Sequence, residues 1–285
     1  MPRFSLIMAT KGRTDEVRAY LASLAAQSYS DFELIIVDQN DDDRLAPILA
    51  SFTMQEKIVH LKSEPGLSKS RNKALKLVTG EIIAFPDDDC WYPTGLLTSV
   101  DKWFAENPEY GILTMTVRDE EGELSANKWK AEACDIAPIN IFRTTASYSL
   151  FIRRSPLAQG VIFDEDLGVG CKTPFGSGED TDFVLHLMKK GIRGRFISTS
   201  HVGHPRRDMF SGAVTPDRAY SYGLGMGRVL GKHSLPLLGA ALFSFDVLRA
   251  VRGFCMGRFE GSNLCWMHGR AILMGYVARE NSSAM

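Results

Sequence analysis

The chain contains, at positions 82–91, the run Ile82-Ile83-Ala84-Phe85-Pro86-Asp87-Asp88-Asp89-Cys90-Trp91. Its apolar half is typical of a buried strand, which ends where the proline and three consecutive acids begin. Adjacent carboxylates repel one another and raise one another's pKa unless positive charge lies between them. Two interpretations fit these acids: they hold a divalent cation that also binds phosphate oxygens, or they form a solvated turn before a helix that starts near Pro93.

Strands and helices alternate on the amino-terminal side of this run. Apolar runs predict strands over residues 4–9, 32–37, 58–61 and 81–85. Thr14 is a candidate N-cap for a first helix, and further helices are expected over about 45–52 and around Lys69 and Arg71. This alternation predicts an α/β fold of βαβ units, with a mostly parallel central sheet flanked by helices on both faces.

Polar clusters follow three of the predicted strands, at 10–13, 38–41 and 87–89. Ligands bind beyond the carboxyl ends of parallel strands, so these clusters are expected to share one site. The first cluster and the segment with Lys69 and Arg71 supply positive charge, and the other two supply carboxylates. A nucleoside diphosphate needs both, together with a metal that bridges its phosphates. The glycine-rich loops typical of Rossmann dinucleotide sites and of P-loops are absent from the sequence.

Four segments, 5–13, 34–41, 66–72 and 85–89, together resemble family 2 glycosyltransferases of the GT-A fold. The resemblance implies a D-x-D motif at Asp87 and Asp89 that binds Mn²⁺ or Mg²⁺, with Asp89 as the preferred ligand. It also implies a nucleoside contact for Asp38, although many members read D-D-x-S-x-D from this position and this chain does not. Arg71 and Asn72 match an R-N motif of the family. The residues assigned to the nucleotide sugar are Thr10, Lys11, Arg13, Asp38, Asn40, Lys69, Arg71, Asp87 and Asp88.

A glycine-rich segment, 168–178, precedes the acids Glu179, Asp180 and Asp182 at the start of a helix expected over 181–190. The helix dipole favours acids there, so capping is one interpretation. The glycines allow the backbone to approach a ligand closely, which favours a site. The resemblance implies that Asp180, with Glu179 as the alternative, is the general base for an acceptor hydroxyl, and that transfer inverts the anomeric carbon. Asp182 is expected to cap the helix or to face solvent.

Two histidines and two arginines follow the next predicted strand, 195–198. A lone histidine is usually structural or solvated. However, His204-Pro205 matches a pair that family members often have at this place, so His204 is a candidate metal or phosphate ligand and His201 a weaker one. Arg206 and Arg207 either hold an anionic group or lie on the surface.

The C-terminal region differs in character from the rest of the chain. Residues 220–228 resemble a Y-G-x-G-x-G stretch of bacterial polysaccharide enzymes in the family, and residues 235–251 are strongly apolar with arginines nearby. Such a sequence suits either a helix at a membrane interface or a helical appendage packed on the catalytic core. No window reaches the apolar length of a membrane span. The predicted organisation is a catalytic domain over 1–215, with a nucleotide-sugar half (1–118) and an acceptor half (119–215), then a helical region over 216–285. That region either contacts a membrane through 235–280 or packs on the catalytic core.

Composition argues against several protein classes. The 285 residues carry a net charge of -1, which provides no basic field for nucleic acid. The five cysteines are widely spaced and form no C-x-x-C pair, so neither a zinc knuckle nor a disulfide framework is indicated. We therefore expect a cytoplasmic location, at the inner face of the cytoplasmic membrane if the C-terminal region binds there.

The predicted function is metal-dependent, inverting transfer of a sugar from a nucleotide-diphosphate sugar to a hydroxyl of a glycan or polyprenyl-linked acceptor in surface polysaccharide synthesis. The resemblance favours UDP as the nucleotide. Two alternatives stay open: a nucleotidyltransferase that makes a nucleotide sugar, and a non-catalytic, membrane-associated protein that keeps the fold. The second alternative predicts loss of the site acids, whereas Asp38, Asp87, Asp89, Glu179 and Asp180 are all present.

Overall fold

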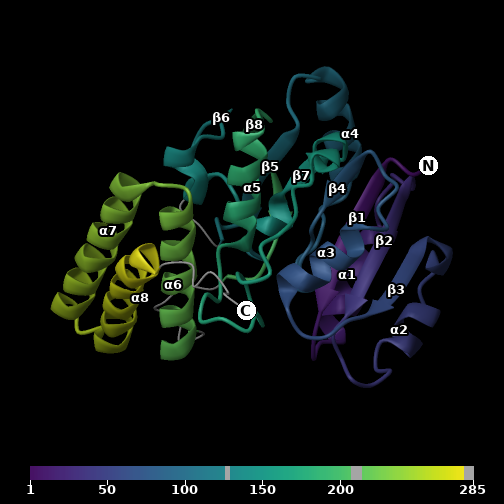
Figure 1. The fold of residues 1–285 in the computed structure, drawn as a ribbon. Helices are drawn as coiled ribbons and strands as arrows, with labels where there is room; N and C mark the ends of the chain where they lie inside the picture. The colour runs from purple at the N-terminus through teal and green to yellow at the C-terminus, as the bar shows by residue number, and fades with distance from the viewer. Residues whose placement is uncertain (126–128, 207–213, 279–285) are drawn as a thin grey trace, which may run out of the picture. The chain divides into compact units, whose positions relative to one another are not determined.

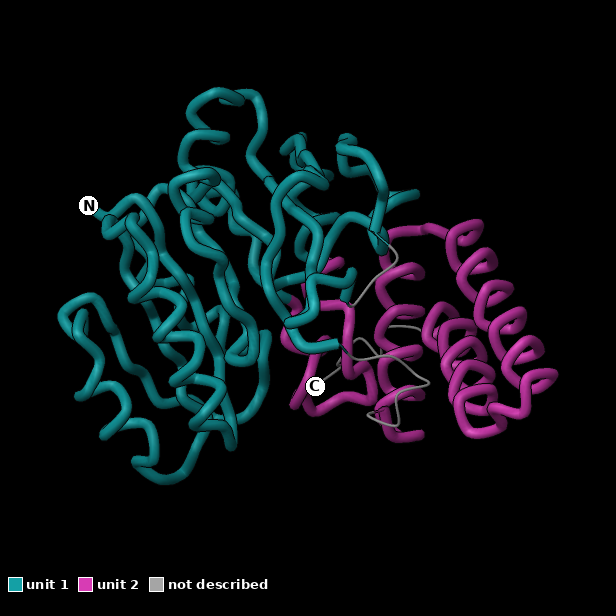
Figure 2. The backbone as a smooth tube through the Cα atoms, turned by 180° about the vertical axis from the view of Figure 1, so that it is seen from behind, with its two compact units in different colours: residues 1–163, 183–206 teal, residues 164–182, 207–285 magenta. Residues whose placement is uncertain are grey.

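The computed structural model describes residues 1–125, 129–206 and 214–278. Arg207, a candidate anion contact, and the last two residues of the predicted membrane-binding region lie outside the described residues. By its internal contacts the chain divides into two compact units (Figure 2). The first comprises Met1–Phe163 and Phe183–Arg206, and the second comprises Asp164–Asp182 and Arg207–Met285. The division falls inside helix α5 (Glu179–Lys189), whose first turn is counted with the second unit.

The first unit is built on a mixed sheet. Its strands, within the described residues, are β1 (Phe4–Thr10), β2 (Phe32–Asp38), β3 (Ile58–Lys62), β4 (Ile82–Ala84), β5 (Ile112–Arg118), β6 (Cys134–Asp135), β7 (Phe151–Arg153) and β8 (Gly194–Gly203). Their order across the sheet is β3-β2-β1-β4-β7-β5-β8-β6 (Figure 1). β3, β2, β1 and β4 are mutually parallel, as are β5 and β8, whereas β7 is antiparallel to both of its neighbours. The prediction of a mostly parallel sheet is confirmed.

Helices connect the strands of the first unit. They are α1 (Asp15–Ala25), α2 (Ala46–Ala50), α3 (Leu67–Leu75) and α4 (Leu96–Glu106), with 3₁₀ turns at Gln55–Lys57, Pro138–Arg143, Ser147–Ser149 and Ser155–Gln159. Side chains on both faces of β1 and β2 are buried, as expected for a sheet covered on both faces. α4 begins at Leu96 rather than near Pro93, because Gly95 takes a left-handed φ of 80° that does not continue a helix.

The second unit contains α6 (Pro216–Lys232), α7 (Pro236–Cys255) and α8 (Phe259–Val277), in which α8 packs against both other helices (Figure 1). α6 and α8 approach so closely that only glycine fits between them. A Cβ atom added at Gly223 would lie 2.4 Å from the His268 carbonyl oxygen, and one at Gly227 would lie 2.1 Å from that of Ile272. Helix packing therefore explains glycines of the Y-G-x-G-x-G stretch. Within the described part of the chain, none of the helices combines the length and apolarity needed to cross a membrane.

Candidate functional site

The carboxyl ends of β1, β2 and β3 bring polar side chains together. Thr10 and Asp38 are register partners at the ends of β1 and β2, and Asp38 pairs in turn with Lys62 at the end of β3. The buried Asp38 carboxylate accepts hydrogen bonds from the backbone and side-chain nitrogens of Asn40, at 2.8 and 2.7 Å, and its other oxygen lies 3.1 Å from both His60 and Lys62. Burial acts to raise the pKa of Asp38, but these hydrogen bonds outweigh it and hold the pKa below its ordinary value. The carboxylate therefore stays ionised.

Asp88, the middle acid of the triplet, is tied to the end of β1. The Thr10 hydroxyl donates to its Oδ2 at 2.6 Å, and Arg13 Nη1 lies 2.5 Å from its Oδ1. The same nitrogen lies 2.8 Å from Asp89 Oδ2. Arg13 is thus shared between two carboxylates, and Asp88 holds the end of the first strand against the triplet. Its contact with the nucleotide sugar stays a prediction.

Asp87 faces a buried arginine. Arg71 Nη2 lies 3.2 Å from its Oδ1, and the guanidinium stacks over the rings of Phe85 and Phe163 at 5.9 and 5.3 Å. Burial, together with the neighbouring acids, raises the pKa of Asp87 to about 6, although Arg71 and His204 act in the opposite direction. The negative charge of this group is therefore incompletely compensated by protein cations.

A strand bridge places His204 beside the triplet. Trp91 and Gly203 exchange two backbone hydrogen bonds, at 3.0 and 2.9 Å. A Cβ atom at Gly203 would lie 1.9 Å from the Trp91 ring, so only glycine allows this approach. As a result, Nε2 of the next residue, His204, lies 3.3 Å from Asp89 Oδ1.

The hydrogen bonding of His204 makes its Nε2 atom a candidate ligand. Its Nδ1 lies 2.8 Å from the Pro205 carbonyl oxygen, which can only accept, so Nδ1 carries the proton in the neutral ring. Stacking on Tyr148, with centroids 4.3 Å apart, fixes the ring. Nε2 is then the ring nitrogen that faces Asp89 Oδ1, where it is placed to share a cation with that carboxylate.

Three side chains at this edge have the spacing of a metal site. The ligand atoms of Asp87, Asp89 and His204 all lie within 4.8 Å of one another. Two carboxylates and an imidazole suit a divalent cation of the Mn²⁺ class. The residues present therefore fit the cation that the D-x-D motif implies.

Other predicted site residues take different positions. Lys69 is exposed and lies 2.5 Å from Glu64 Oε2, and Lys11 is exposed beyond the end of β1. Asn72 exchanges two hydrogen bonds of 2.9 Å with the backbone of Phe163, so it holds α3 to that segment. The site roles of the two lysines stay predictions.

His60 and Lys62 contact Asp38 but were not marked by any sequence motif. Their spacing of two along a strand places both side chains on one face, which is a readable signal. Their contact with Asp38 also depends on the register of β3 against β2, which pairs Asp38 with Lys62. Local sequence does not reveal that register.

The acids of the glycine-rich segment lie in the first turn of α5, two residues earlier than the predicted helix start. Glu179 is buried, and a Cβ atom added at Gly168 would lie 3.0 Å from its Oε2. Asp180 is half-buried, and its Oδ1 accepts a hydrogen bond of 2.6 Å from the Thr181 backbone nitrogen. Asp180 is thus the more accessible of the two candidate bases.

The prediction that Asp182 caps the helix or faces solvent is wrong. Its side chain is 0% exposed, with Nε2 of His233 2.7 Å from one oxygen and Nζ of Lys232 3.0 Å from the other. These partners lie 50 and 51 positions further along the chain, beyond the reach of local pattern analysis. Glycines expected to approach a ligand also have another role, since Gly176 and Gly178 contact α6.

Comparison with protein families matches the glycosyl transferase family 2 model over residues 5–155, more than half of the chain. A PGL/p-HBAD biosynthesis glycosyltransferase of Mycobacterium tuberculosis is 27% identical over 186 residues, covering 60% of this chain and 70% of that protein. The UDP-Glc:alpha-D-GlcNAc-diphosphoundecaprenol beta-1,3-glucosyltransferase WfaP of Escherichia coli is 25% identical over 201 residues, covering 68% and 74%. An uncharacterized glycosyltransferase of Haemophilus influenzae is 33% identical over 90 residues, covering 31% of this chain but only 30% of that protein's length.

Solved structures share the fold. S. aureus TarS 1–349 superposes with a TM-score of 0.63 at 17% identity, covering 94% of this chain and 91% of that one. The mannosyltransferase PcManGT from Pyrobaculum calidifontis, in complex with GDP-Man and Mn²⁺, gives 0.62 at 15% identity, covering 97% and 86%. The predicted GT-A fold is confirmed. With this fold and a family match over more than half of its length, the chain belongs to glycosyltransferase family 2.

Proposed function

We propose that this protein is a metal-dependent, inverting glycosyltransferase that moves a sugar from a nucleotide-diphosphate sugar to a hydroxyl of a glycan or lipid-linked acceptor. The observation that carries the proposal is the convergence of Asp87, Asp89 and His204 beside Arg13 and Arg71. This group offers oxygen and nitrogen ligands for a cation and guanidinium groups for phosphate at one sheet edge. Residues 1–118 supply most of the nucleotide-sugar contacts, and residues 119–215 receive the acceptor.

Each residue of the strand-end group has a proposed role. Asp89, Asp87 and His204 would hold Mn²⁺ or Mg²⁺. When bound, that cation stabilises the charge of the departing nucleoside diphosphate. Arg13 and Arg71, with the exposed lysines Lys11 and Lys69, bind phosphate oxygens.

The nucleoside is assigned to the edge formed by Thr10, Asp38 and Asn40. A nucleotide-sugar donor is supported by related structures: TarS was solved with UDP-GlcNAc, and PcManGT with GDP-Man. We propose UDP as the first nucleotide to test.

Asp180 is the proposed general base, with Glu179 as the alternative. Its half-buried carboxylate is more accessible than that of Glu179. Deprotonation of the acceptor hydroxyl as it attacks the anomeric carbon, opposite the departing diphosphate, gives inversion in one displacement.

We propose that the acceptor is presented at a membrane on its cytoplasmic side. The turn between α7 and α8 exposes Phe254, Met256 and Phe259 by 64%, 54% and 60%, and exposed arginines, Arg252 and Arg258, flank them. Aromatic side chains with flanking arginines suit an anionic lipid surface. WfaP, whose name specifies a diphosphoundecaprenol-linked acceptor, supports a lipid-linked substrate.

Calorimetry of the full chain with UDP and GDP, with and without Mn²⁺, tests the nucleotide and metal roles. We expect binding that requires Mn²⁺, that disappears in Asp89→Asn, and that persists in Asp180→Asn. The control is Asp31→Asn, which alters an exposed acid at the opposite end of β2. Binding that is independent of Mn²⁺, or unchanged in Asp89→Asn, would contradict the proposal.

Turnover of UDP-glucose, UDP-GlcNAc and GDP-mannose by the same variants tests the base. Hydrolysis or transfer should fall by about 10³-fold or more in Asp180→Asn while nucleotide binding stays intact. Product stereochemistry, read by NMR at the anomeric carbon, should be inverted.

Flotation with vesicles tests the membrane contact. The protein should bind vesicles that contain phosphatidylglycerol and bind pure phosphatidylcholine weakly, because the exposed arginines require anionic lipid. The double variant Phe254→Ser/Phe259→Ser should lose binding, whereas Leu237→Ser, at the other end of α7, should keep it. Equal flotation of all three proteins, or none, would exclude the proposed surface.

A further inference from the structure

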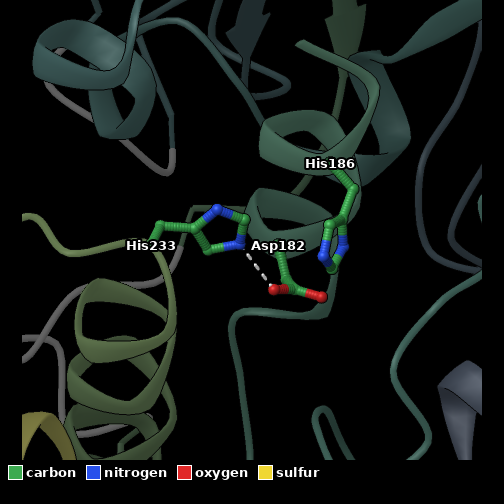
Figure 3. Close-up of side chains that lie close together, drawn as sticks. All are labelled: Asp182, His186 and His233. Carbon is green, nitrogen blue, oxygen red and sulfur yellow. Dashed lines mark hydrogen bonds and ion pairs between the residues drawn. The ribbon is translucent and has the colours of Figure 1, made fainter. Parts of the chain in front are cut away.

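A buried ion-pair cluster joins the first turn of α5 to the end of α6. Figure 3 shows Asp182 and His233 facing each other, with Nε2 of the histidine 2.7 Å from Asp182 Oδ1. Lys232 places Nζ 3.0 Å from the other oxygen of Asp182 and 2.6 Å from Asp164. The side chains of Asp182 and His233 are 0% and 1% exposed. Two consecutive residues at the end of α6 thus hold one carboxylate from both sides.

This cluster differs from a metal site in its charge. His186, drawn with the pair in Figure 3, lies one turn beyond Asp182 on α5, so an aspartate and two histidines are available. However, the Lys232 ammonium already contacts the carboxylate. Burial acts to lower the pKa of Lys232, but its contacts with Asp164 and Asp182 outweigh this and raise it, so the lysine is charged. A fixed positive charge next to Asp182 disfavours a second cation.

The loop before α5 also lies against α6. The Gly176 backbone nitrogen donates to Ser221 O at 3.1 Å, and the Ser177 hydroxyl donates to Tyr222 O at 2.8 Å. A Cβ atom added at Gly178 would lie 2.7 Å from Val229 Cγ2. Contacts therefore run along α6 from Ser221 to Val229 and end in the Lys232–His233 cluster.

We propose that Lys232 and His233 are positioning residues, which hold the first turn of α5, and with it Glu179 and Asp180, in the geometry that deprotonates the acceptor. This inference rests on the proposed function, because it assigns the base to that turn. Asp182 follows the two acids within the same turn, and its backbone nitrogen bonds to Gly178 O at 2.8 Å. A shift of Asp182 therefore moves both candidate bases.

The expected size of the effect follows from two general results. Removing one partner of a buried ion pair leaves an uncompensated charge, which the structure relieves by local movement. A misplacement of about 1 Å at a reacting group lowers the rate by about 100-fold. The helical region would then contribute to catalysis through α6 without contacting the substrate.

Amide hydrogen exchange of the full chain tests the positioning directly. In Lys232→Met, which keeps the apolar stem but removes the charge, amides of residues 168–182 should exchange about tenfold faster. Amides of α8 should keep their wild-type rates, which separates local release from general destabilisation. Lys232→Arg should restore protection, and Lys190→Met, which removes an exposed charge just beyond α5, should change nothing.

Kinetics provide the second measurement. With whichever UDP- or GDP-sugar the wild type turns over, kcat of Lys232→Met and His233→Leu should fall about 100-fold. The donor KM and the Mn²⁺-dependent affinity for UDP or GDP should stay unchanged. Unchanged exchange in residues 168–182, equal acceleration in α8, or a changed KM with constant kcat would overturn the positioning role. Faster exchange in a chain whose wild type neither binds nor turns over nucleotide sugars would instead overturn the proposed function.

Discussion

The strand-end cluster of the first unit (Asp87, Asp89 and His204) and the Asp182 cluster of the second unit both combine aspartate with histidine. In the second, each oxygen of Asp182 has its own cationic or hydrogen-bonding partner, and the Asp182 side chain is 0% exposed. At the strand ends, three consecutive acids share two arginines, and the pKa of Asp87 rises to about 6. The same residue types thus form a compensated structural cluster in one place and an under-compensated one in the other. The balance of protein charge distinguishes a metal site from an ion-pair network.

The largest effect is expected from removing the compensated carboxylate. Asp182→Ala should lower the free energy of unfolding by about 3–5 kcal/mol, because it removes the carboxylate that buried His233 and half-buried Lys232 share. Asp89→Ala should lower the free energy of unfolding far less, because Arg13 still has Asp88 as an ion-pair partner. Urea denaturation of both variants, beside Asp31→Ala, measures the difference. Equal losses in the two variants would show that the clusters do not differ in charge balance.

The second largest expected effect is a gain in stability on adding Mn²⁺, which should depend on the strand-end cluster alone. Mn²⁺ at 100 times its dissociation constant should stabilise the metal-free wild type by about 2.7 kcal/mol. The gain should vanish in Asp89→Asn and persist in His233→Gln, because only the strand-end group is expected to bind the cation. Thermal unfolding after dialysis against EDTA, with and without added Mn²⁺, provides the measurement. Loss of the gain in His233→Gln would place a metal in the second unit instead.

The strand-end group was largely predictable from sequence, for a physical reason. Apolar runs define the strands, and parallel strands place their carboxyl ends at one edge, so Thr10, Asp38 and Asp87 had to lie near one another. The position of His204 beside these residues could not be predicted in the same way. It depends on the bridge between Trp91 and Gly203, whose residues are more than a hundred positions apart and leave no periodic signal.

The second cluster was not predictable from local pattern. Asp182 looks like any acid in a first helical turn, where the helix dipole alone accounts for it. Its burial is set by α6, whose glycines pack so closely against α8 and the loop before α5 that no side chain intervenes. A sequence indicates that such glycines exist, but it does not say which segment they face.

Substitution of the under-compensated acid should stabilise the protein. The pKa of Asp87 rises from 3.8 to about 6 on folding, so between these values the folded state holds a proton that the unfolded state has released. The contribution of Asp87 to the free energy of unfolding therefore falls as the pH rises from 3.8 to about 6. Above about pH 6 its ionised carboxylate destabilises the folded state by the full amount. Asp87→Asn should gain about 1–3 kcal/mol at pH 8 without metal, and much less at pH 4. Urea denaturation at the two pH values measures this, and a loss of stability at pH 8 would contradict it.

The smallest effect is expected at the edge of the compensated cluster. Asp164 is 27% exposed at its side chain and contacts Lys232 at 2.6 Å, while Asp182 holds the same ammonium from the buried side. Asp164→Asn should therefore cost only about 0.5–1 kcal/mol, as expected for a partly solvated ion pair. Amide exchange of residues 168–182 should stay within about twofold of wild type, because the buried pair remains intact. A loss as large as that of Asp182→Ala would show that Lys232 is held mainly by its outer partner. The two clusters would then differ less than their burial suggests, since each would depend on a carboxylate in contact with solvent.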